Sequence, residues 1–408
     1  MLRALDSSKG GSQLAEATQI EQRPRILLYT RIRKAPFFYA SRRHGVKIYS
    51  VYNHFYHPRH YGDPVEEYWH LLNEVTLWDV GVERQIEISG PDAFTFTNLL
   101  VPRDLSKCKV SQCKYVFITA ADGGIINDPV LLRTDQNVFR LSLADSDVDL
   151  WARGVAYHSG LNVRIQEVDI APVQIQGPRA KEVIRDLFGP EVPEIPYYDM
   201  ALGLKLDGMD VEVSRTGYSG EIGFEIYLHN ARRDAEKLWR AVLEAGAPHG
   251  LRVIGPCHIR RIEAGILAYG ADMWLDNNPF EVGLGYSWMV DLDQDADFIG
   301  KDALKRIKEE GVKQKLVGLD IGGEPLGTYI DSEMIDFFPV YAEGREVGRV
   351  TSSCFSPRLQ KNIGFAMLPV EFEELGTELE VDHPASGRVR CVVSPKPAFD
   401  PSKEIPKA

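Results

Sequence analysis

A turn between two apolar runs constrains this chain more than any other feature. The runs lie at 115–118 and 130–132 and the turn residues at 121–124, a spacing that predicts a β-hairpin. Asp128 falls at the start of the second strand, where the alternation asks for an apolar side chain. Pro129 cannot donate to the strand ladder, so we expect a strand edge or a bulge there. Asp128 then either bonds its own backbone in the turn or serves a functional site, and the pattern leaves both open.

The composition is that of a soluble globular protein with room for two or three domains. Of its 408 residues, 44% are hydrophobic and 26% are charged. The net charge of -12 argues against a nucleic-acid partner, which requires a basic face, but it allows a local basic pocket. No apolar run is long enough to span a membrane. We expect the polar residues 1–22, which lack the apolar segment of a secretory signal, to form a flexible tail.

The cysteines argue against a disulfide framework and against a metal site. Their number is odd and no CxxC spacing occurs, so we expect small buried thiols and a reducing cytoplasm. The five residues are Cys108, Cys113, Cys257, Cys354 and Cys391.

Local patterns predict a mixture of helices and strands. A helix is expected over 64–78, with Asp63 as its N-cap, and its apolar face is expected to hold Val65, Trp69, Leu72 and Val75. Residues 23–62 are interpreted as turns and short strands, and their basic and aromatic residues either line an anion pocket or form a solvated face. Short strands from 311 to 400 predict a β-barrel or a jelly-roll-like domain.

A second motif lies at 215–227, where three glycines precede a strand. Glycines so closely spaced mark a backbone that approaches something closely. Glu225 stands between Phe224 and Ile226 in the strand, so its side chain points away from theirs. The alternative is an ordinary outward-facing strand glutamate.

Four stretches in this order resemble the glycine-cleavage T-protein family, the folate-dependent aminomethyltransferases: 122–128, 215–227, 261–265 and 298–301. The resemblance covers about residues 45–395. It implies an α+β fold of three domains in a ring, with folate in a central channel. Residues 23–310 would form two intertwined α+β domains that bind folate, and 311–400 the barrel.

Within this family, the chain is most similar to the dimethylsulfoniopropionate (DMSP) demethylase branch. The similar segments include 49–54, 144–147, 278–281 and 356–361. The loop at 218–223 instead looks like that of the aminomethyltransferases, which leaves the methyl donor less defined than the cofactor.

The resemblance also assigns candidate residues for binding tetrahydrofolate. Asp128 matches the catalytic acid beside the reacting folate nitrogen, and Glu225 matches the glutamate that bonds the pterin. Tyr115 matches an aromatic residue beside the folate. Arg358 and Lys361 are candidates for the glutamate tail of the cofactor. No metal is expected.

The chemistry of an onium donor adds candidates for its binding. A methyl group on a sulfonium is already activated, because the leaving thioether is neutral. An anionic Asp128 could stabilise the cationic centre, and aromatic rings could hold it by cation–π attraction. We expect Tyr218, Trp151 and Tyr197 as candidates for this aromatic wall.

We therefore expect a cytoplasmic methyltransferase that moves a methyl group from a small onium donor, DMSP first, to tetrahydrofolate. Alternatives of the same fold are an aminomethyltransferase or methylamine-processing enzyme, and an O-demethylase of methoxy-aromatics that would use His54 or His57 as an acid. A folate-binding regulatory protein is the non-enzymatic alternative. The small-molecule donor is the expected partner, with neither nucleic acid nor membrane, and a homo-oligomer stays open.

Overall fold

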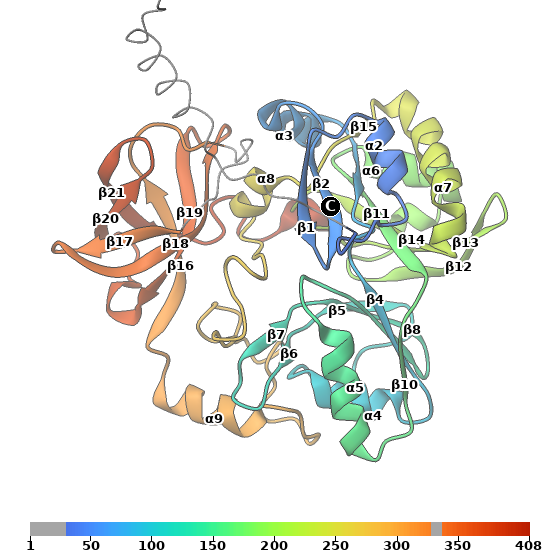
Figure 1. The fold of residues 1–408 in the computed structure, drawn as a ribbon, viewed down its shortest axis with the longest axis horizontal. Helices are drawn as coiled ribbons and strands as arrows, with labels where there is room; N and C mark the ends of the chain where they lie inside the picture. Colours follow the sequence, from blue (N-terminus) through green and yellow to red (C-terminus); the bar gives the residue numbers. More distant parts are fainter. Residues whose placement is uncertain (1–29, 328–336) are drawn as a thin grey trace, which may run out of the picture.

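The computed structural model describes residues 30–327 and 337–408, and the tail expected at 1–22 lies outside them. The described chain forms a six-stranded sheet, a five-stranded sheet and a closed barrel. Figure 1 shows the barrel on the left, the first sheet at the upper right and the second at the lower right. The predicted combination of α+β parts with a C-terminal barrel is therefore confirmed.

The first sheet is built from two separate stretches of the chain. Its order is β12-β13-β14-β11-β3-β15, and its strands are β3 (Thr76–Asp79), β11 (Ile170–Gln176), β12 (Met200–Leu206), β13 (Met209–Ser214), β14 (Gly223–His229) and β15 (Arg252–Val253). All of the second sheet lies between β3 and β11 in the sequence. The two parts are intertwined for this reason.

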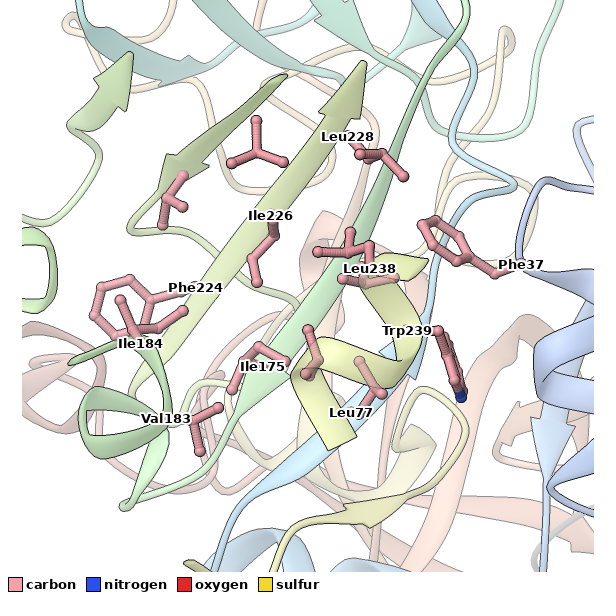
Figure 2. Close-up of a cluster of buried hydrophobic side chains, with 14 of the residues drawn as sticks. Phe37, Leu77, Ile175, Val183, Ile184, Phe224, Ile226, Leu228, Leu238 and Trp239 are labelled. Atoms are coloured by element: carbon pink, nitrogen blue, oxygen red, sulfur yellow. The ribbon is translucent and has the colours of Figure 1, made fainter. Parts of the chain in front are cut away.

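The two faces of the first sheet differ in chemistry. On β14, Phe224, Ile226 and Leu228 are fully buried, and they alternate with Glu225 and Tyr227 on the opposite face. Two helices cover the apolar face, α6 (Ala180–Phe188) and α7 (Ala231–Gly246), with Val183, Ile184, Leu238 and Trp239 among the side chains packed there (Figure 2). The other face is buried too, although it carries polar side chains, and such a face requires hydrogen-bond partners.

The second sheet has its own core and helices. Its order is β10-β4-β9-β8-β5, and its elements are β4 (Gln85–Ser89), α4 (Ala93–Leu100), β5 (Gln112–Tyr115), β8 (Val130–Asp135), β9 (Val138–Ser142), α5 (Val148–Ser159) and β10 (Arg164–Glu167). Burial of Ile86, Ile88 and Leu141 against Phe96 of α4 holds this layer together.

The predicted hairpin forms, but in two pieces. Strands β5 and β8 pair at its base, and the short strands β6 (Ile118–Thr119) and β7 (Ile125–Asn127) pair near the turn. Asp128 and Pro129 lie in the interruption between β7 and β8. The strand is thus broken at Pro129, where the sequence predicts a strand edge or a bulge.

The helix predicted over 64–78 is too long. Helix α3 spans Pro64–Asn73, and the residues after it form strand β3. The N-cap is as predicted, because Asp63 accepts hydrogen bonds from Val65 N (2.9 Å) and Glu66 N (3.0 Å). The predicted apolar face is wrong in one residue: Trp69 is 40% exposed, whereas Val65 and Leu72 pack against the core, as do the buried Tyr68 and Leu71. The strand after the helix draws Val75 into a different core, which the helical period could not show.

The N-terminal segment holds a helix that the sequence interpretation missed, α2 (Phe38–Arg43), followed by a hairpin of β1 (Ile48–Tyr52) and β2 (Phe55–His60). The hairpin register is irregular. Tyr49 faces Pro58 and Ile48 faces His60, so Arg59 has no partner across the pair. Arg59 is thus the extra residue of a β-bulge, a device that re-aims a side chain.

The C-terminal barrel closes in the order β16-β19-β18-β17-β20-β21. Its strands are β16 (Gln314–Ile321), β17 (Phe338–Ala342), β18 (Arg345–Ser356), β19 (Lys361–Pro369), β20 (Glu378–His383) and β21 (Gly387–Ser394). Three more helices flank the barrel sequence, namely α8 (His258–Glu263), α9 (Lys301–Glu310) and the terminal α10 (Glu404–Lys407). Helix α8 ends just before Gly265, which adopts a left-handed φ of 68°.

The described residues add three findings to this picture. No helix within 30–327 and 337–408 has both the length and the apolar character needed to cross a bilayer. The same ranges hold no group of three His, Cys, Asp or Glu side chains suited to a metal ion. The five cysteines are free and buried.

Candidate functional site

Asp128 is half-buried, and one of its two carboxylate oxygens is buried and unused within the described residues. Its Oδ2 accepts a hydrogen bond from the Tyr115 hydroxyl at 2.8 Å. Its Oδ1 is buried and has no hydrogen-bond partner in the part of the chain that the structure describes. Burial raises the pKa of Asp128 to about 7, against the lowering effect of the Tyr115 hydrogen bond, and the charge on Asp272 raises it further. A buried acceptor without a partner is suited to bind a hydrogen-bond donor or a cation.

The interrupted hairpin explains how Asp128 reaches this position. Asn127, the last residue of β7, donates from its side chain to Ala144 O (3.0 Å) and to Ser146 Oγ (2.8 Å). These contacts tie the hairpin to the 144–147 segment. The side-chain hydrogen bond of the turn itself comes from Asp122, whose Oδ1 accepts from Gly124 N at 3.0 Å. Asp122 therefore caps the turn, whereas the side chain of Asp128 bonds Tyr115, and its own backbone N–H also lowers its pKa.

Tyrosines surround Asp128. Burial raises the pKa of Tyr218 to about 12 and that of Tyr269 to about 12, and the charge on Asp128 contributes to both shifts. Burial also raises the pKa of Tyr52, with contributions from Glu83 and Asp128. The Tyr218 hydroxyl donates to Leu267 O at 3.0 Å. The carboxylate therefore lies among phenol rings, which exclude water and keep the local dielectric low.

Glu225 lies on the polar face of the first sheet and is 3% exposed. Its Oε1 accepts from Gln174 Nε2 (2.7 Å), and its Oε2 accepts from Thr216 Oγ1 (2.9 Å) and from the Tyr227 hydroxyl. Burial raises the pKa of Glu225, and these three hydrogen bonds oppose the rise. An ionised carboxylate has about four acceptor positions, so about one remains free here.

Gln174 adds a further acceptor beside Glu225. Its Nε2 donates to Glu225, which fixes the amide orientation, and its Oε1 is buried without a partner in the described residues. Glu83 brings a second carboxylate close, because burial and then the charge on Glu225 raise the pKa of Glu83. Glu83 and Asp128 both act on Tyr52. Glu83 and Tyr52 therefore link the surroundings of the two predicted carboxylates electrostatically.

The structure brings together only some of the residues singled out from the sequence. Asp128, Tyr115 and Tyr218 belong to one group, and Glu225 lies near it. The charge on Glu225 reaches Tyr197, whose pKa burial raises to about 12. Tyr197 itself lines a small pocket together with Thr216, Glu221 and Arg260.

The other three candidates have different surroundings. Trp151 on α5 packs against the core of the second sheet. The guanidinium carbon of Arg358 lies 4.0 Å from the ring centre of Phe399. Lys361 pairs with Asp320 at 2.5 Å on the exposed side of the barrel. None of these contacts joins the three residues to Asp128 or Glu225. The proposed site therefore does not include Trp151, Arg358 or Lys361.

Several residues of the site escaped sequence reasoning, namely Tyr52, Glu83, Gln174, Thr216 and Tyr269. A signal existed for Gln174, since polar side chains alternate with buried apolar ones along β11 just as Glu225 does along β14. No comparable signal marks Glu83 or Tyr52, because they reach the site from separate segments.

Comparisons with known proteins bear on the family. The model of the GCVT N-terminal domain matches residues 37–294, and that of the glycine cleavage T-protein C-terminal barrel domain matches 315–400. A dimethylsulfoniopropionate demethylase of Ruegeria pomeroyi is 36% identical over 87% of this chain and 94% of its own length. An aminomethyltransferase of Caldanaerobacter subterraneus is 33% identical over 86% of this chain and 91% of its own length.

A solved structure shows the same fold. The glycine cleavage system aminomethyltransferase T from Bartonella henselae superposes with a TM-score of 0.80 at 22% identity, over 90% of this chain and 98% of that one. The expected three-domain architecture with a C-terminal barrel is confirmed by this likeness.

The raised pKa of Asp128 predicts a stability cost that grows with pH. The folded pKa is about 7 and the ordinary value is 3.8, so the folded state holds a proton that the unfolded state releases between these values, and stability falls as pH rises through 7. Asp128→Asn cannot ionise. The variant should therefore be more stable than the wild type at high pH. The difference in unfolding free energy between variant and wild type should be about 1–3 kcal/mol larger at pH 8 than at pH 5, as measured by denaturant titration.

The exposed Asp122→Asn is the control for this titration. It should show no such growth with pH. An Asp128→Asn variant that is destabilised equally at both pH values would contradict the assigned environment of Asp128.

Proposed function

This chain belongs to the glycine cleavage T-protein family, and on that premise we propose that it is a tetrahydrofolate-dependent methyltransferase that demethylates a small onium compound, DMSP first. Relatives in this family are folate-dependent enzymes that transfer methyl or aminomethyl groups. The observation that carries the proposal is Asp128, a half-buried carboxylate whose Oδ1 is buried without a partner in the described residues and whose Oδ2 is held by Tyr115. The DMSP demethylase of Ruegeria pomeroyi supports the choice of donor.

The residues present fit a pterin. A pterin edge offers ring and amino N–H donors, which a carboxylate and an amide oxygen can accept. Glu225 keeps about one acceptor position, and Gln174 Oε1 has no partner among the described residues. Glu225 and Gln174 would hold this edge, with Tyr115 beside Asp128. Tetrahydrofolate, when bound, supplies the nucleophilic nitrogen that accepts the methyl group.

Asp128 would act through charge and position. Its Oδ2 is fixed by the Tyr115 hydroxyl, which leaves Oδ1 to face a positive centre. A preorganised carboxylate in a dry site stabilises positive charge more strongly than water does. The thioether leaves as a neutral molecule, so its departure requires no acid. Tyr218 and Tyr52 supply aromatic surface near the same carboxylate, as an onium group prefers.

An O-demethylase of methoxy-aromatics would require an acid for its leaving phenolate. Burial, followed by the charge on Arg59, holds the pKa of His57 well below its usual range, so this histidine is neutral at pH 7. His54 lies on the surface, 3.5 Å from Asp147. Neither histidine suits the task, which favours the onium donor.

An aminomethyltransferase or methylamine-processing enzyme is the second candidate. The Caldanaerobacter relative, named an aminomethyltransferase, supports it. A folate-binding regulatory protein would bind the cofactor without turnover, and an assay of methylated product separates that alternative from both enzymes.

A donor screen tests the proposed function. The purified protein with tetrahydrofolate should form 5-methyltetrahydrofolate from DMSP or a close onium analogue, detected by mass spectrometry. Glycine-derived aminomethyl donors should give no product. Turnover of a methoxybenzoate, with no reaction of any sulfonium, would overturn the donor while leaving the folate assignment in place.

Asp128→Asn should lower kcat by about 10²-fold or more, with a smaller change in folate affinity, because the charge is needed mainly in the transition state. The wild-type rate should rise with pH through about 7 as this carboxylate ionises, and the variant should lack that step. Asp122→Asn is the matched control in the same hairpin. Full activity of Asp128→Asn would remove the residue from the mechanism.

Glu225→Gln should weaken tetrahydrofolate binding by about 1–3 kcal/mol, the scale of a hydrogen bond to a charged group, as measured by calorimetry. The matched control is Glu87→Gln in the second sheet, where Glu87 accepts from Gln166 at 3.2 Å. Unchanged affinity in a folded Glu225→Gln protein would exclude Glu225 from the cofactor site.

A further inference from the structure

Arg59 is a cation that the fold holds in place without a protein partner. It is the extra residue of the bulge in the β1–β2 hairpin. Its backbone is packed tightly, since a Cβ placed on Gly255 would lie 1.8 Å from Arg59 O. Within 30–327 and 337–408, the Arg59 side chain makes no hydrogen bond and no ion pair.

The groups that influence Arg59 include no carboxylate. Burial lowers its pKa, the phenols of Tyr218 and Tyr52 and the Cys257 thiol raise it, and Arg261 lowers it. Arg261 itself is committed to Asp272 at 2.6 Å. Arginines removed from water are nearly always paired, because an unpaired buried charge is costly. Arg59 is half-buried, and no anionic partner for its guanidinium lies among the described residues.

A second observation points to a ligand at the same place. His57, two residues earlier on β2, is 6% exposed, and both of its ring nitrogens are buried without a hydrogen-bond partner in the described chain. The charge on Arg59 acts on this ring. A neutral imidazole carries one N–H donor, so it can join a guanidinium in binding an anion.

The charges of Arg59 and Asp128 act on the same two tyrosines, and the ring centre of Tyr52 lies 5.3 Å from that of His57 beside Arg59. The charge on Asp128 raises the pKa of Tyr52 and of Tyr218, and both phenols raise the pKa of Arg59. No ion pair joins Arg59 to Asp128 among the described residues. The site thus has a negative end and a positive end that do not neutralise each other.

Resting on the proposed function, we infer that Arg59 binds the carboxylate of a zwitterionic methyl donor, whose onium group lies at Asp128. The donor class is then an onium carboxylic acid, such as a sulfonium or quaternary ammonium acid, and neither a simple methylamine nor a sulfonium without an acid group. A guanidinium presents two parallel N–H donors that match a carboxylate.

Tetrahydrofolate also carries carboxylates, but they are separated from its reacting nitrogen by the aminobenzoyl group. Arg59 instead shares Tyr52 and Tyr218 with the carboxylate at the proposed reaction centre. A short donor can span the two charges from that centre. For this reason we assign Arg59 to the donor and not to the cofactor.

The test compares DMSP with its amide, which keeps the sulfonium and lacks the carboxylate. Wild-type kcat/KM should be higher for the acid, and Arg59→Gln should lower it about 10- to 100-fold for the acid while leaving the amide within about twofold. Arg59→Lys should retain part of the preference, because it keeps the charge but loses the planar fork. Arg232→Gln, at an arginine whose side chain is 79% exposed, is the control.

Two results would overturn the assignment. An equal loss for the acid and the amide would show that Arg59 only supports the fold. A weakening of tetrahydrofolate binding by Arg59→Gln, with the acid-to-amide ratio unchanged, would assign the residue to the cofactor.

A binding measurement separates this inference from the proposed function. The demethylated acid, 3-(methylthio)propionate, should bind the wild type by calorimetry, and Arg59→Gln should lose that binding. If the wild type turns over no onium donor yet binds this acid through Arg59, the proposed function fails and the carboxylate site stands. If the wild type and the Arg59→Gln variant both treat the acid and its amide alike in binding and turnover, the carboxylate site at Arg59 is excluded.

Discussion

The buried ion pair between Arg261 and Asp272 joins the segment of helix α8 to the barrel near the candidate site. Asp272 accepts from Arg261 Nη1 (2.6 Å), from Ala268 N (2.9 Å) and from two barrel hydroxyls, Thr351 (2.7 Å) and Ser352 (2.6 Å). Helix α8, the turn after it and strand β18 therefore share one network. Every acceptor of Asp272 is used, which is the condition under which a buried pair is tolerated, and the loss of one partner would be costly.

This network also sets the electrostatics of its surroundings. Asp272 and Arg261 satisfy each other, whereas Asp128 and Arg59, which act on the same two tyrosines, have no ion-pair partner in the described residues. Both are partly withdrawn from water, and each is less stable in its charged form for that reason. A folded protein keeps such groups where binding or catalysis uses them, and the stability lost there must be recovered in the cores of the sheets and the barrel.

The polar face of the first sheet follows the same logic. Its apolar face packs on α6 and α7, and the opposite face buries Gln174, Glu225 and Tyr227 in mutual hydrogen bonds. These bonds hold most acceptors but leave Gln174 Oε1 without a partner in the described residues. The sheet thus presents a rigid surface with few free hydrogen-bond acceptors. A ligand with matching donors would be held there without rearrangement of the fold.

The sequence by itself determined the local features: the interrupted hairpin with Asp128, the N-cap Asp63, the alternation that turns Glu225 away from Phe224, and the strand-rich barrel. These follow from turn chemistry and side-chain period, which act within a few residues. The motif order was enough to indicate the family. Only the tertiary structure decided that the segment after Asn73 is a strand, that Lys361 pairs with Asp320, and that Arg59 has no acid beside it. Burial and the identity of a charge's neighbours depend on segments far apart in the chain, and no local pattern records them.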